Sequence, residues 1–220
     1  GYVDALLAYA RQNNIAAVVP LIDTELPVLA GTHDRFRHIG TQLILSSPEV
    51  VELTSDKVRT SEFLREHGFD TPRILDETEL AAPPLPVFMK PRSGSSSIRA
   101  RRVDTMEELK YFMAACPEDI VQEYIDGQEH TVDVFTNLEG KPLCAVPRRR
   151  HEVRGGEVSK GQTVRDRKII DTCMRLAETL ESCCGMVTMQ CFRNGEGRVV
   201  VIEINPRFGG GVPLSIRAGA

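Results

Sequence analysis

The chain has 220 residues, of which 41% are hydrophobic and 26% charged, and its formal net charge is -4 at pH 7. This composition indicates a folded globular protein with room for one large or two small domains, and it excludes a disordered chain. No apolar stretch approaches the roughly 20 residues of a membrane helix, and no long basic stripe offers a surface to nucleic acid, so we expect neither partner.

Six cysteines are scattered along the chain without a C-x-x-C pair, the spacing that zinc sites and redox motifs use. We therefore expect reduced, mostly buried thiols in a cytoplasmic protein. The chain begins at Gly1 rather than methionine and stops at IRAGA, in what resembles the first turns of a helix. We expect it to be a portion of a longer protein.

The first part of the chain alternates helix and strand. Apolar residues recur at helical spacing over residues 3–10, IAAVVPLI at 15–22 is a fully apolar run, and TQLILSS at 41–47 predicts a second strand. Fully apolar strands are typical of parallel sheets. We therefore predict part of an α/β domain over residues 1–54.

Two acids, Asp23 and Glu25, follow the first of these strands. Ligand sites in α/β sheets lie beyond the carboxyl ends of the strands. Acids at the start of a helix also cap its free N–H groups. A functional role and a capping role both stay open for these two residues.

From Pro86 onward, short strands separated by loops replace the alternating pattern. Two clear helices interrupt them, one over 105–116 with Asp104 as its cap and one over 167–182. Mostly antiparallel strands with helices packed on them define an α+β fold, which is the fold class that we predict.

One strand pair carries an unusual set of polar residues. VTMQCFRNGEGRVVVIEIN at 187–205 predicts a β-hairpin, because NGEG between two apolar runs is strong turn chemistry. A symmetric loop places Gln190 opposite Val201. Side chains alternate between the faces of a strand, so Gln190, Glu203 and Asn205 then share one face.

A carboxylate with two amide oxygens, and no His or Cys, suits Mg²⁺ or Mn²⁺. The competing interpretation is an ion pair between Glu203 and Arg207 or Arg193, with Asn205 capping the turn that follows. A bulge of one residue at the turn would also put Gln190 on the other face. The metal hypothesis therefore depends on other segments.

Two other segments offer groups that a nucleotide needs. Lys90 ends an apolar strand, and the Ser/Gly loop after it in FMKPRSGSSS offers N–H groups and hydroxyls to phosphates. The turn at Asp126 and Gly127 offers backbone groups to an adenine edge, and Glu129 after it offers a carboxylate to ribose hydroxyls. Each segment is also compatible with a plain hairpin.

The order of these segments resembles the ATP-grasp fold, and most closely the ATP-binding halves of carbamoyl phosphate synthetase. The resemblance spans residues 15–220 and is carried by SDK with Lys57, FMKPRSGSSS with Lys90, QEYIDGQEHTVDV, MQCF and VIEINPRFGGG. The segment IEINPR, preceded by a strand with Gln, is its most specific element.

The resemblance implies a domain organisation. Residues 55–220 would form an ATP-grasp domain, with two α+β lobes that grip ATP and an incomplete C-terminal end. The small lobe would span about 71–121 and the large lobe about 122–220. Part of an α/β pre-ATP-grasp domain over 1–54 would precede it.

The resemblance also implies roles for individual residues. The metal ligands would be Gln190, Glu203 and Asn205, and Arg207 with Asn205 would act on the reacting phosphate. A Gln in place of the acid common in the family leaves the number of metals open. The residues that would bind the nucleotide are Lys57, Lys90, Ser95, Glu123, Tyr124, Ile125 and Glu129.

In PRRRHEVR, the arginines Arg148, Arg150 and Arg154 alternate along a strand and its exit. They would face a substrate carboxylate or an acyl phosphate, for which Arg is the bidentate choice. Charged residues on a solvated edge strand are the competing interpretation. The roles of His151 and Glu157 stay open.

The chemistry that the resemblance implies is phosphorylation of a carboxylate by ATP, with an acyl phosphate intermediate, ADP as product and an amine as acceptor. ATP and Mg²⁺ (or Mn²⁺) would be the cofactors, small-molecule carboxylate and amine substrates the partners, and a homodimer stays open. The alternative is a non-catalytic or regulatory ATP-binding module of the same fold. Carboxylation through carboxyphosphate is a third hypothesis.

Overall fold

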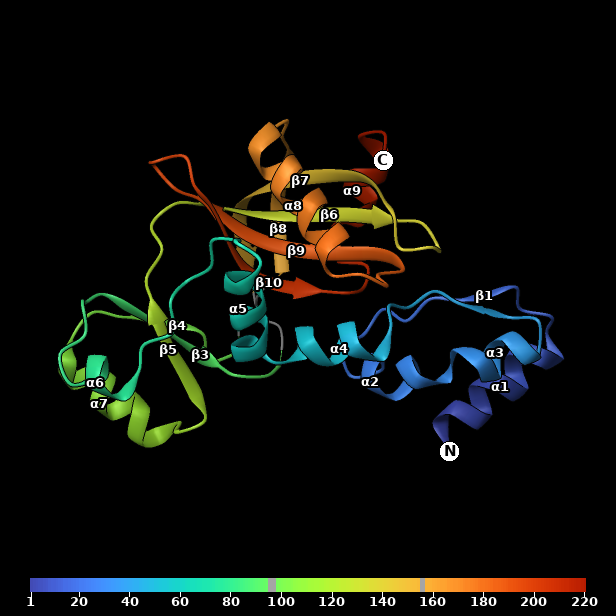
Figure 1. Cartoon of the computed structure of the whole chain (residues 1–220), viewed down its shortest axis with the longest axis horizontal. Helices are drawn as coiled ribbons and strands as arrows, with labels where there is room; N and C mark the ends of the chain where they lie inside the picture. The colour runs from blue at the N-terminus through green and yellow to red at the C-terminus, as the bar shows by residue number, and fades with distance from the viewer. Residues whose placement is uncertain (95–97, 155–156) are drawn as a thin grey trace.

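The computed structural model of the chain describes residues 1–94, 98–154 and 157–220, and of Val153, Arg154 and Glu157 only the backbone. In Figure 1 a large sheet with its helices lies at the top, and two smaller units lie below it, one at each side. Each of these parts has its own cluster of buried apolar side chains. The sheet at the top of Figure 1 and the sheet at the left are both antiparallel, and helices pack on each of them, which confirms the α+β prediction.

The N-terminal unit is built around a parallel strand pair. Ala17 in its first strand lies opposite Gln42 in its second. Leu29, Phe36 and Leu43 are buried between the pair and the helices, so the unit is of the α/β kind. Its elements are α1 (Tyr2–Gln12), β1 (Ala17–Val18), α2 (Leu26–Leu29), the 3-10 helix η1 (Ala30–Thr32), α3 (His33–His38) and β2 (Gln42–Leu43).

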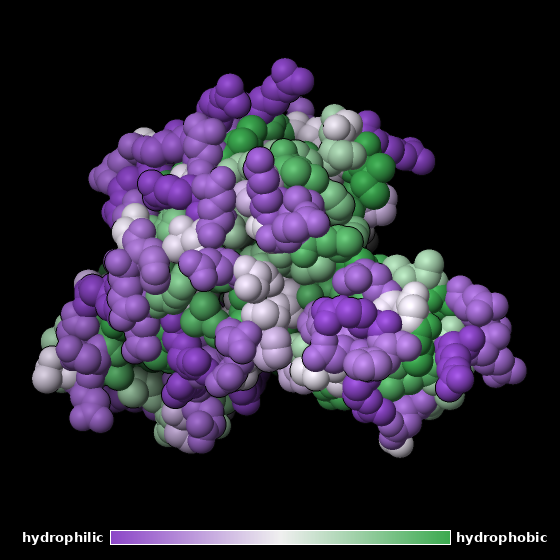
Figure 2. Space-filling model, turned by 45° about the vertical axis from the view of Figure 1, so that its right-hand side comes forward, coloured by the Kyte–Doolittle hydropathy of each residue, from purple (hydrophilic) through white to green (hydrophobic). Residues whose placement is uncertain are grey.

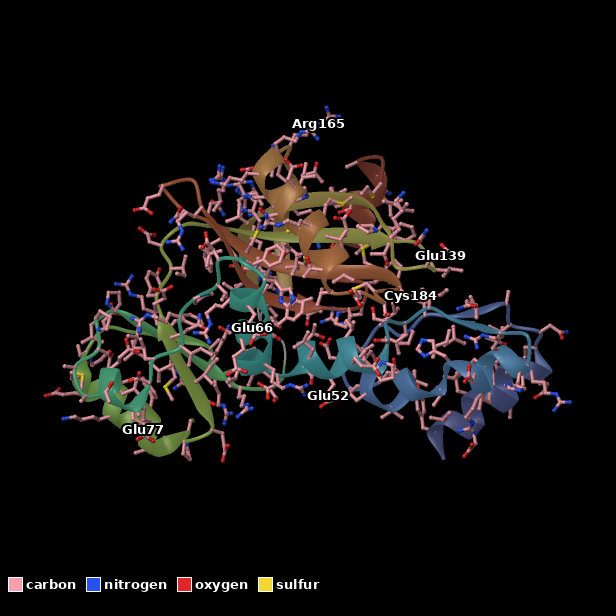
Figure 3. The ribbon with its side chains drawn as sticks, in the orientation of Figure 1. Glu52, Glu66, Glu77, Glu139, Arg165 and Cys184 are labelled. Atoms are coloured by element: carbon pink, nitrogen blue, oxygen red, sulfur yellow. The ribbon has the colours of Figure 1, made fainter. Side chains whose placement is uncertain are left out.

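Two helices, α4 (Pro48–Ser55) and α5 (Lys57–Glu66), connect this unit to the rest of the chain. The unit also contacts residues 180–184, the segment between α8 (Arg167–Thr179) and β9 (Gly185–Arg193), directly. The N–H of Cys184 donates to Ser46 Oγ at 3.1 Å, and the N–H of Ser47 donates to the Ser182 carbonyl at 3.1 Å. Figure 3 shows Cys184 where the N-terminal unit meets the upper unit. In Figure 2 apolar surface extends down the upper unit toward this junction.

The small sheet has the strand order β4-β3-β5, and it is antiparallel. Met89 and Leu109 are fully buried between this sheet and α7. The cap of α7 is Thr105, whose hydroxyl accepts the N–H of Glu108 and whose own N–H donates to the Glu108 carboxylate. The prediction of Asp104 as cap is therefore wrong by one residue. The elements are α6 (Glu77–Leu80), β3 (Val87–Pro91), β4 (Arg101–Val103), α7 (Met106–Ala115) and β5 (Asp119–Glu123).

The large sheet is antiparallel with the order β10-β9-β6-β7-β8. One face is covered by α8, whose Ile169, Cys173 and Leu176 are fully buried with Val132 and Met189 of the sheet. The opposite face is left for polar residues. The elements are β6 (Gln128–Thr136), β7 (Pro142–Arg154), β8 (Glu157–Thr163), α8 (Arg167–Thr179), β9 (Gly185–Arg193), β10 (Val199–Asn205) and α9 (Val212–Arg217).

The six cysteines all lie in the described ranges and are free, three of them buried and three partly buried. Burial raises the pKa of the Cys183 thiol to about 12, so this thiol stays protonated at neutral pH. Among the described residues, no helix combines the length and the apolar character that crossing a membrane requires.

Candidate active site

Polar side chains cross the face of the large sheet opposite α8. Glu203 in β10 is paired with Gln190 in β9, and Gln190 is paired with Thr131 in β6. Asn205 lies two residues beyond Glu203 on the same strand, so its side chain points to the same face. The structure therefore brings the three expected metal ligands together on one face.

The register of this hairpin differs from the predicted one. The strands pair regularly up to Val201, and a bulge at Ile202 then shifts the pairing so that Glu203 faces Gln190. Without the bulge, Glu203 would lie opposite the buried Met189 and share its face. The predicted pairing of Gln190 with Val201 was wrong by one residue, because Val201 pairs with Cys191 and the turn is therefore not symmetric. The bulge at Ile202, within β10 and not at the turn, then brings Glu203 opposite Gln190.

Lys90 reaches from the small sheet to β10, the strand that carries Glu203 and Asn205. Its side chain is largely buried at 9% exposure, and Nζ donates to the carbonyl oxygen of Ile202, the bulge residue, at 3.2 Å. Burial lowers the pKa of Lys90 from 10.5 to about 8, Glu203 raises it and Lys57 lowers it. The charges of Lys57 and Glu203 therefore both act on the Lys90 ammonium.

Lys57 is held at the start of α5 by its neighbours. Its Nζ donates to the Gly94 carbonyl at 2.6 Å, and its backbone N–H donates to the Arg92 carbonyl at 3.0 Å. Asp56 caps α5 and also binds Arg92 through both carboxylate oxygens at 2.6 to 3.0 Å. The predicted phosphate contact Ser95 lies outside the described residues.

Residues Glu123, Tyr124 and Ile125 form the crossing from the small sheet to the large one (Figure 1). The N–H of Glu123 donates to the Arg73 carbonyl at 2.9 Å, and its carboxylate accepts the N–H of Arg73 at 3.1 Å. A nucleobase cannot share that Glu123 amide. The Tyr124 ring packs against Arg102, whose guanidinium carbon is 4.7 Å from the ring centroid.

Glu129, the predicted ribose ligand, lies on the polar face of β6 and is paired with an arginine. Arg150 Nε lies 3.2 Å from Glu129 Oε1, and Arg150 Nη1 donates to Thr131 Oγ1 at 3.2 Å. Burial raises the pKa of the Glu129 carboxyl, Arg150 lowers it, and Glu203 raises it further. Arg150 therefore supports the Glu129 carboxylate within the site, a role that the sequence pattern did not separate from substrate binding.

Arg148 has neither of its predicted roles. Its strand, β7, lies between β6 and β8 and is not an edge. Arg148 is 3% exposed, and its Nε and Nη2 donate to the two carboxylate oxygens of Asp133 at 2.7 and 2.9 Å. Ser215 Oγ in α9 donates to the same carboxylate at 2.5 Å. The side chains of Arg154 and Glu157 lie outside the described part of the chain.

The Arg148–Asp133 pair leaves room only for a glycine at position 211. A Cβ on Gly211 would lie 1.9 Å from Arg148 Nη1, which the two bonds to Asp133 hold in place. We expect Gly211→Ala to lower the free energy of unfolding by about 3 kcal/mol, because it disrupts a buried ion pair. Urea unfolding measures this loss.

The control is Gly195→Ala in the hairpin turn, where a Cβ meets nothing within 4 Å. Equal stability of Gly211→Ala and Gly195→Ala would contradict the expected clash.

The two arginines considered as partners for Glu203 pair with other carboxylates. Arg207 Nε and Nη2 donate to Asp23 Oδ1 and Oδ2 at 2.5 and 2.7 Å, and Arg193 Nε donates to Asp166 at 3.1 Å. Asp23 therefore contacts the site, and α2 has no side-chain cap. Its position beyond the carboxyl end of β1 was the sequence signal for this role.

The described residues contain no group of three or more His, Cys, Asp or Glu side chains that could hold a metal ion. A cation would therefore depend on the Glu203 carboxylate together with the amide oxygens of Gln190 and Asn205. These are hard oxygen donors on one face, which is the chemistry that Mg²⁺ and Mn²⁺ prefer.

Comparison with known families agrees with this geometry. The family described as ATP-grasp domain matches residues 54–211. The chain belongs to the ATP-grasp family. A second family, described as PylC-like, N-terminal domain, matches residues 1–44. The two matches meet near α4, where the N-terminal unit gives way to the rest of this ATP-grasp chain.

Two relatives of this ATP-grasp chain show how much of a longer protein it spans. Carbamoyl-phosphate synthase from Methanobrevibacter smithii is 25% identical over 226 residues, covering 94% of this chain and 61% of that protein. Phosphoribosylamine–glycine ligase from Vibrio cholerae is 24% identical over 245 residues, covering 94% and 56%. The chain therefore spans between 56% and 61% of the length of these curated relatives.

Solved structures share the fold. D-alanine–D-alanine ligase from Bacillus anthracis, complexed with ATP, has a TM-score of 0.73 at 20% identity and covers 96% of this chain and 76% of that one. Biotin carboxylase from Campylobacter jejuni, in a β,γ-ATP complex, has a TM-score of 0.79 at 17% identity and covers 98% and 54%. The ATP-grasp fold that the sequence resemblance implied is confirmed.

Proposed function

We propose that this chain is the nucleotide-binding part of an ATP-dependent ligase that phosphorylates a carboxylate and passes the acyl group to an amine, with ADP as product. The observation that carries the proposal is the row of Glu203 and Gln190 beneath the buried ammonium of Lys90, within an ATP-grasp fold. Similarity to carbamoyl-phosphate synthase over 94% of the chain supports a related, carbamoyl phosphate synthetase-like chemistry.

Positive charge is what this reaction demands of the protein. Phosphoryl transfer to a carboxylate brings two anions together, so the transition state needs fixed cations around it. Lys90 supplies one, because a pKa of about 8 keeps it protonated at pH 7. Lys57 is close enough to lower the pKa of Lys90. Arg207 follows Asn205 by two residues in the chain, and it would supply a third cation to the phosphates.

Glu203, Gln190 and Asn205 would hold Mg²⁺ or Mn²⁺ on the polar face. When bound, the metal supplies positive charge to the phosphates of ATP. The metal also compensates the negative charge of the Glu203 carboxylate, which lies near the buried Lys90. Arg207 and Asn205 would act at the terminal phosphate and the acyl phosphate.

The rest of the nucleotide would extend along the crossing between the sheets. Adenine would meet the carbonyl of Glu123 and the backbone of Tyr124 and Ile125, since the Glu123 amide is already bonded. The ribose would lie near Glu129, whose carboxylate Arg150 holds on the polar face. This order places the phosphates toward Lys90.

The hydrophobic clusters support the proposed domains. One cluster lies within residues 3–51, which agrees with an N-terminal domain over 1–54. Another lies within 75–121, which agrees with a small lobe over about 71–121 of the 55–220 domain. We propose small-molecule substrates and a cytoplasmic location, which the free cysteines support.

A chromatographic assay of the nucleotide products tests the proposal. Mg-ATP is incubated with the protein and with pools of amino acids and small carboxylic acids. We expect ADP to form only with particular pools, because acyl phosphate chemistry needs its carboxylate. AMP as the product would overturn the proposal, and ATP binding without turnover in any pool would favour the non-catalytic or regulatory module.

A further inference from the structure

Every nitrogen and oxygen atom of Arg207 makes a hydrogen bond to another part of the protein. Its Nη1 donates to the Phe208 carbonyl at 3.2 Å, and its backbone N–H donates to the Asn205 carbonyl at 2.8 Å. Thr188 Oγ1 donates to the carbonyl of Arg207 at 2.9 Å. The two bonds to Asp23 then set the plane of the guanidinium.

Asp23 comes from outside the part of the chain that matches the ATP-grasp domain. It lies in the N-terminal unit, 184 residues before Arg207, and the ATP-grasp match begins only at residue 54. The side chain of Arg207 is 17% exposed and that of Asp23 is 31% exposed, so the pair lies at the surface of the site rather than in a core.

Contacts other than this pair also hold the N-terminal unit in place. The unit is joined to the segment just before β9 of the large sheet by the bonds from Cys184 to Ser46 and from Ser47 to Ser182. Leu26, close to Asp23 in the chain, is buried in the cluster of the unit itself. Loss of the Asp23 carboxylate should therefore change the order of Arg207 and not the packing of the unit.

We infer that Asp23 is a positioning residue, which holds the Arg207 guanidinium in the orientation that meets the terminal phosphate of ATP. The inference rests on the proposed function, in which Arg207 contacts that phosphate. A long arginine side chain that is already fixed loses less conformational entropy when an anion binds. The N-terminal unit thereby contributes to the phosphate end of a site that the ATP-grasp domain otherwise forms.

Removal of the Asp23 charge has two opposite effects, which makes the inference testable. The carboxylate repels a phosphate, so its loss alone would strengthen the binding of anions. Loss of order in Arg207 would weaken binding, and only for the nucleotide that carries a γ-phosphate, which ADP lacks. The sign of the change therefore separates a positioning role from plain charge repulsion.

The experiment measures the affinities of the Mg²⁺ complexes of ADP and of the ATP analogue AMPPNP by titration calorimetry. For Asp23→Asn we expect AMPPNP affinity to fall about tenfold and ADP affinity to stay within about twofold, as lost side-chain order predicts. Asp23→Glu, which can still pair with Arg207, should restore part of the AMPPNP affinity. Thermal melting checks that each variant is folded.

The matched control is Asp70→Asn. Asp70 is also paired bidentately with a distant arginine, Arg198, with contacts of 3.0 and 3.1 Å, and both side chains are about half exposed at 46% and 51%. This variant should leave the ratio of the two affinities unchanged.

Two results would overturn the inference in different ways. If wild-type protein prefers AMPPNP and Asp23→Asn keeps or increases that preference, Asp23 does not position Arg207. If wild-type protein binds both nucleotides equally or binds neither, the role of Arg207 in the proposed function fails, and the inference fails with it.

Discussion

Glu203→Gln is expected to lower MgATP affinity about 100-fold, which corresponds to about 2.8 kcal/mol at roughly 1.4 kcal/mol per factor of ten. Glu203 is the one carboxylate in the proposed ligand set, and Mg²⁺ is bound mainly through carboxylate and phosphate oxygens. Glutamine keeps the shape of the side chain and removes its charge. Titration of ATP with and without Mg²⁺ measures the loss, which should be confined to the Mg²⁺-dependent part.

A control on the same hairpin separates the effect of the position of Glu203 from the effect of losing one negative charge. Glu196→Gln changes the same residue type at the exposed hairpin turn between β9 and β10, and it should leave MgATP affinity unchanged. If Glu203→Gln binds MgATP as well as wild type, Glu203 is not a metal ligand.

The structure also predicts a second effect of Glu203→Gln. The Glu203 carboxylate raises the pKa of Lys90 against the effect of burial. Removal of that charge should lower the pKa of Lys90 further below about 8. The variant would then lose part of its lysine charge near neutral pH, so its deficit in ATP binding should grow as the pH rises from 7 to 8.

Lys90→Met should weaken ATP binding about 100-fold, and adenosine binding far less, because the ammonium acts on the phosphates alone. Methionine occupies a similar volume without charge, so the buried position stays filled. Competition binding with ATP and with adenosine measures the two effects. Equal losses for the two ligands would mean that Lys90 is structural.

The matched control for this lysine is Lys141→Met in the exposed turn between β6 and β7, which should change neither affinity. It removes the same charge from the protein. A similar loss of ATP affinity in Lys141→Met would show that net charge, rather than the place of Lys90, sets the affinity.

The lowered pKa of Lys90 also predicts that the free energy of unfolding depends on pH. Its pKa is about 8 in the folded protein, against an ordinary value of 10.5. Below pH 8 the ammonium is charged in both states, and the whole cost of its burial is present. Between about 8 and 10.5 the unfolded chain binds the extra proton, so the free energy of unfolding rises with pH.

This rise should reach about 3 kcal/mol, from 1.36 kcal/mol for each unit of the pKa difference. Lys90→Met lacks the titrating group and should lack the rise, as urea unfolding of both proteins at pH 7 and pH 10 would show. Parallel stability curves for wild type and Lys90→Met would contradict the lowered pKa. The same lowered pKa predicts that ATP affinity in wild type falls as the pH rises through about 8.

Local chemistry marks part of the candidate site in the sequence, and the resemblance to the ATP-grasp fold supplied the other residues. NGEG predicts a turn between two apolar strands, so the polar residues Gln190, Glu203 and Asn205 stand out as exceptions to an apolar pattern. Lys90 is marked in the same way at the end of an apolar strand. These signals depend only on neighbours in the chain.

The orientation of those residues was decided by the tertiary structure. The bulge at Ile202 lies in a run of β-branched residues that all suit a strand, and nothing in the run indicates where an extra residue sits. Yet the bulge sets which face Glu203 occupies, and its carbonyl accepts Lys90. Strand register depends on the partner strand and on what covers each face, so the assumption of a symmetric turn predicted the wrong pairing.

The partners of the arginines were likewise beyond the sequence. Arg148 pairs with Asp133 because β7 lies beside β6, and Arg207 pairs with Asp23 because the N-terminal unit docks on the large sheet. An arginine on a strand can serve a substrate, a neighbouring carboxylate or solvent, and its sequence context is the same in each case. The sequence by itself determined the fold class and the candidate ligands through local patterns, whereas only the packing of distant segments decided which charges meet, since ion pairs form between groups that the fold brings close in space.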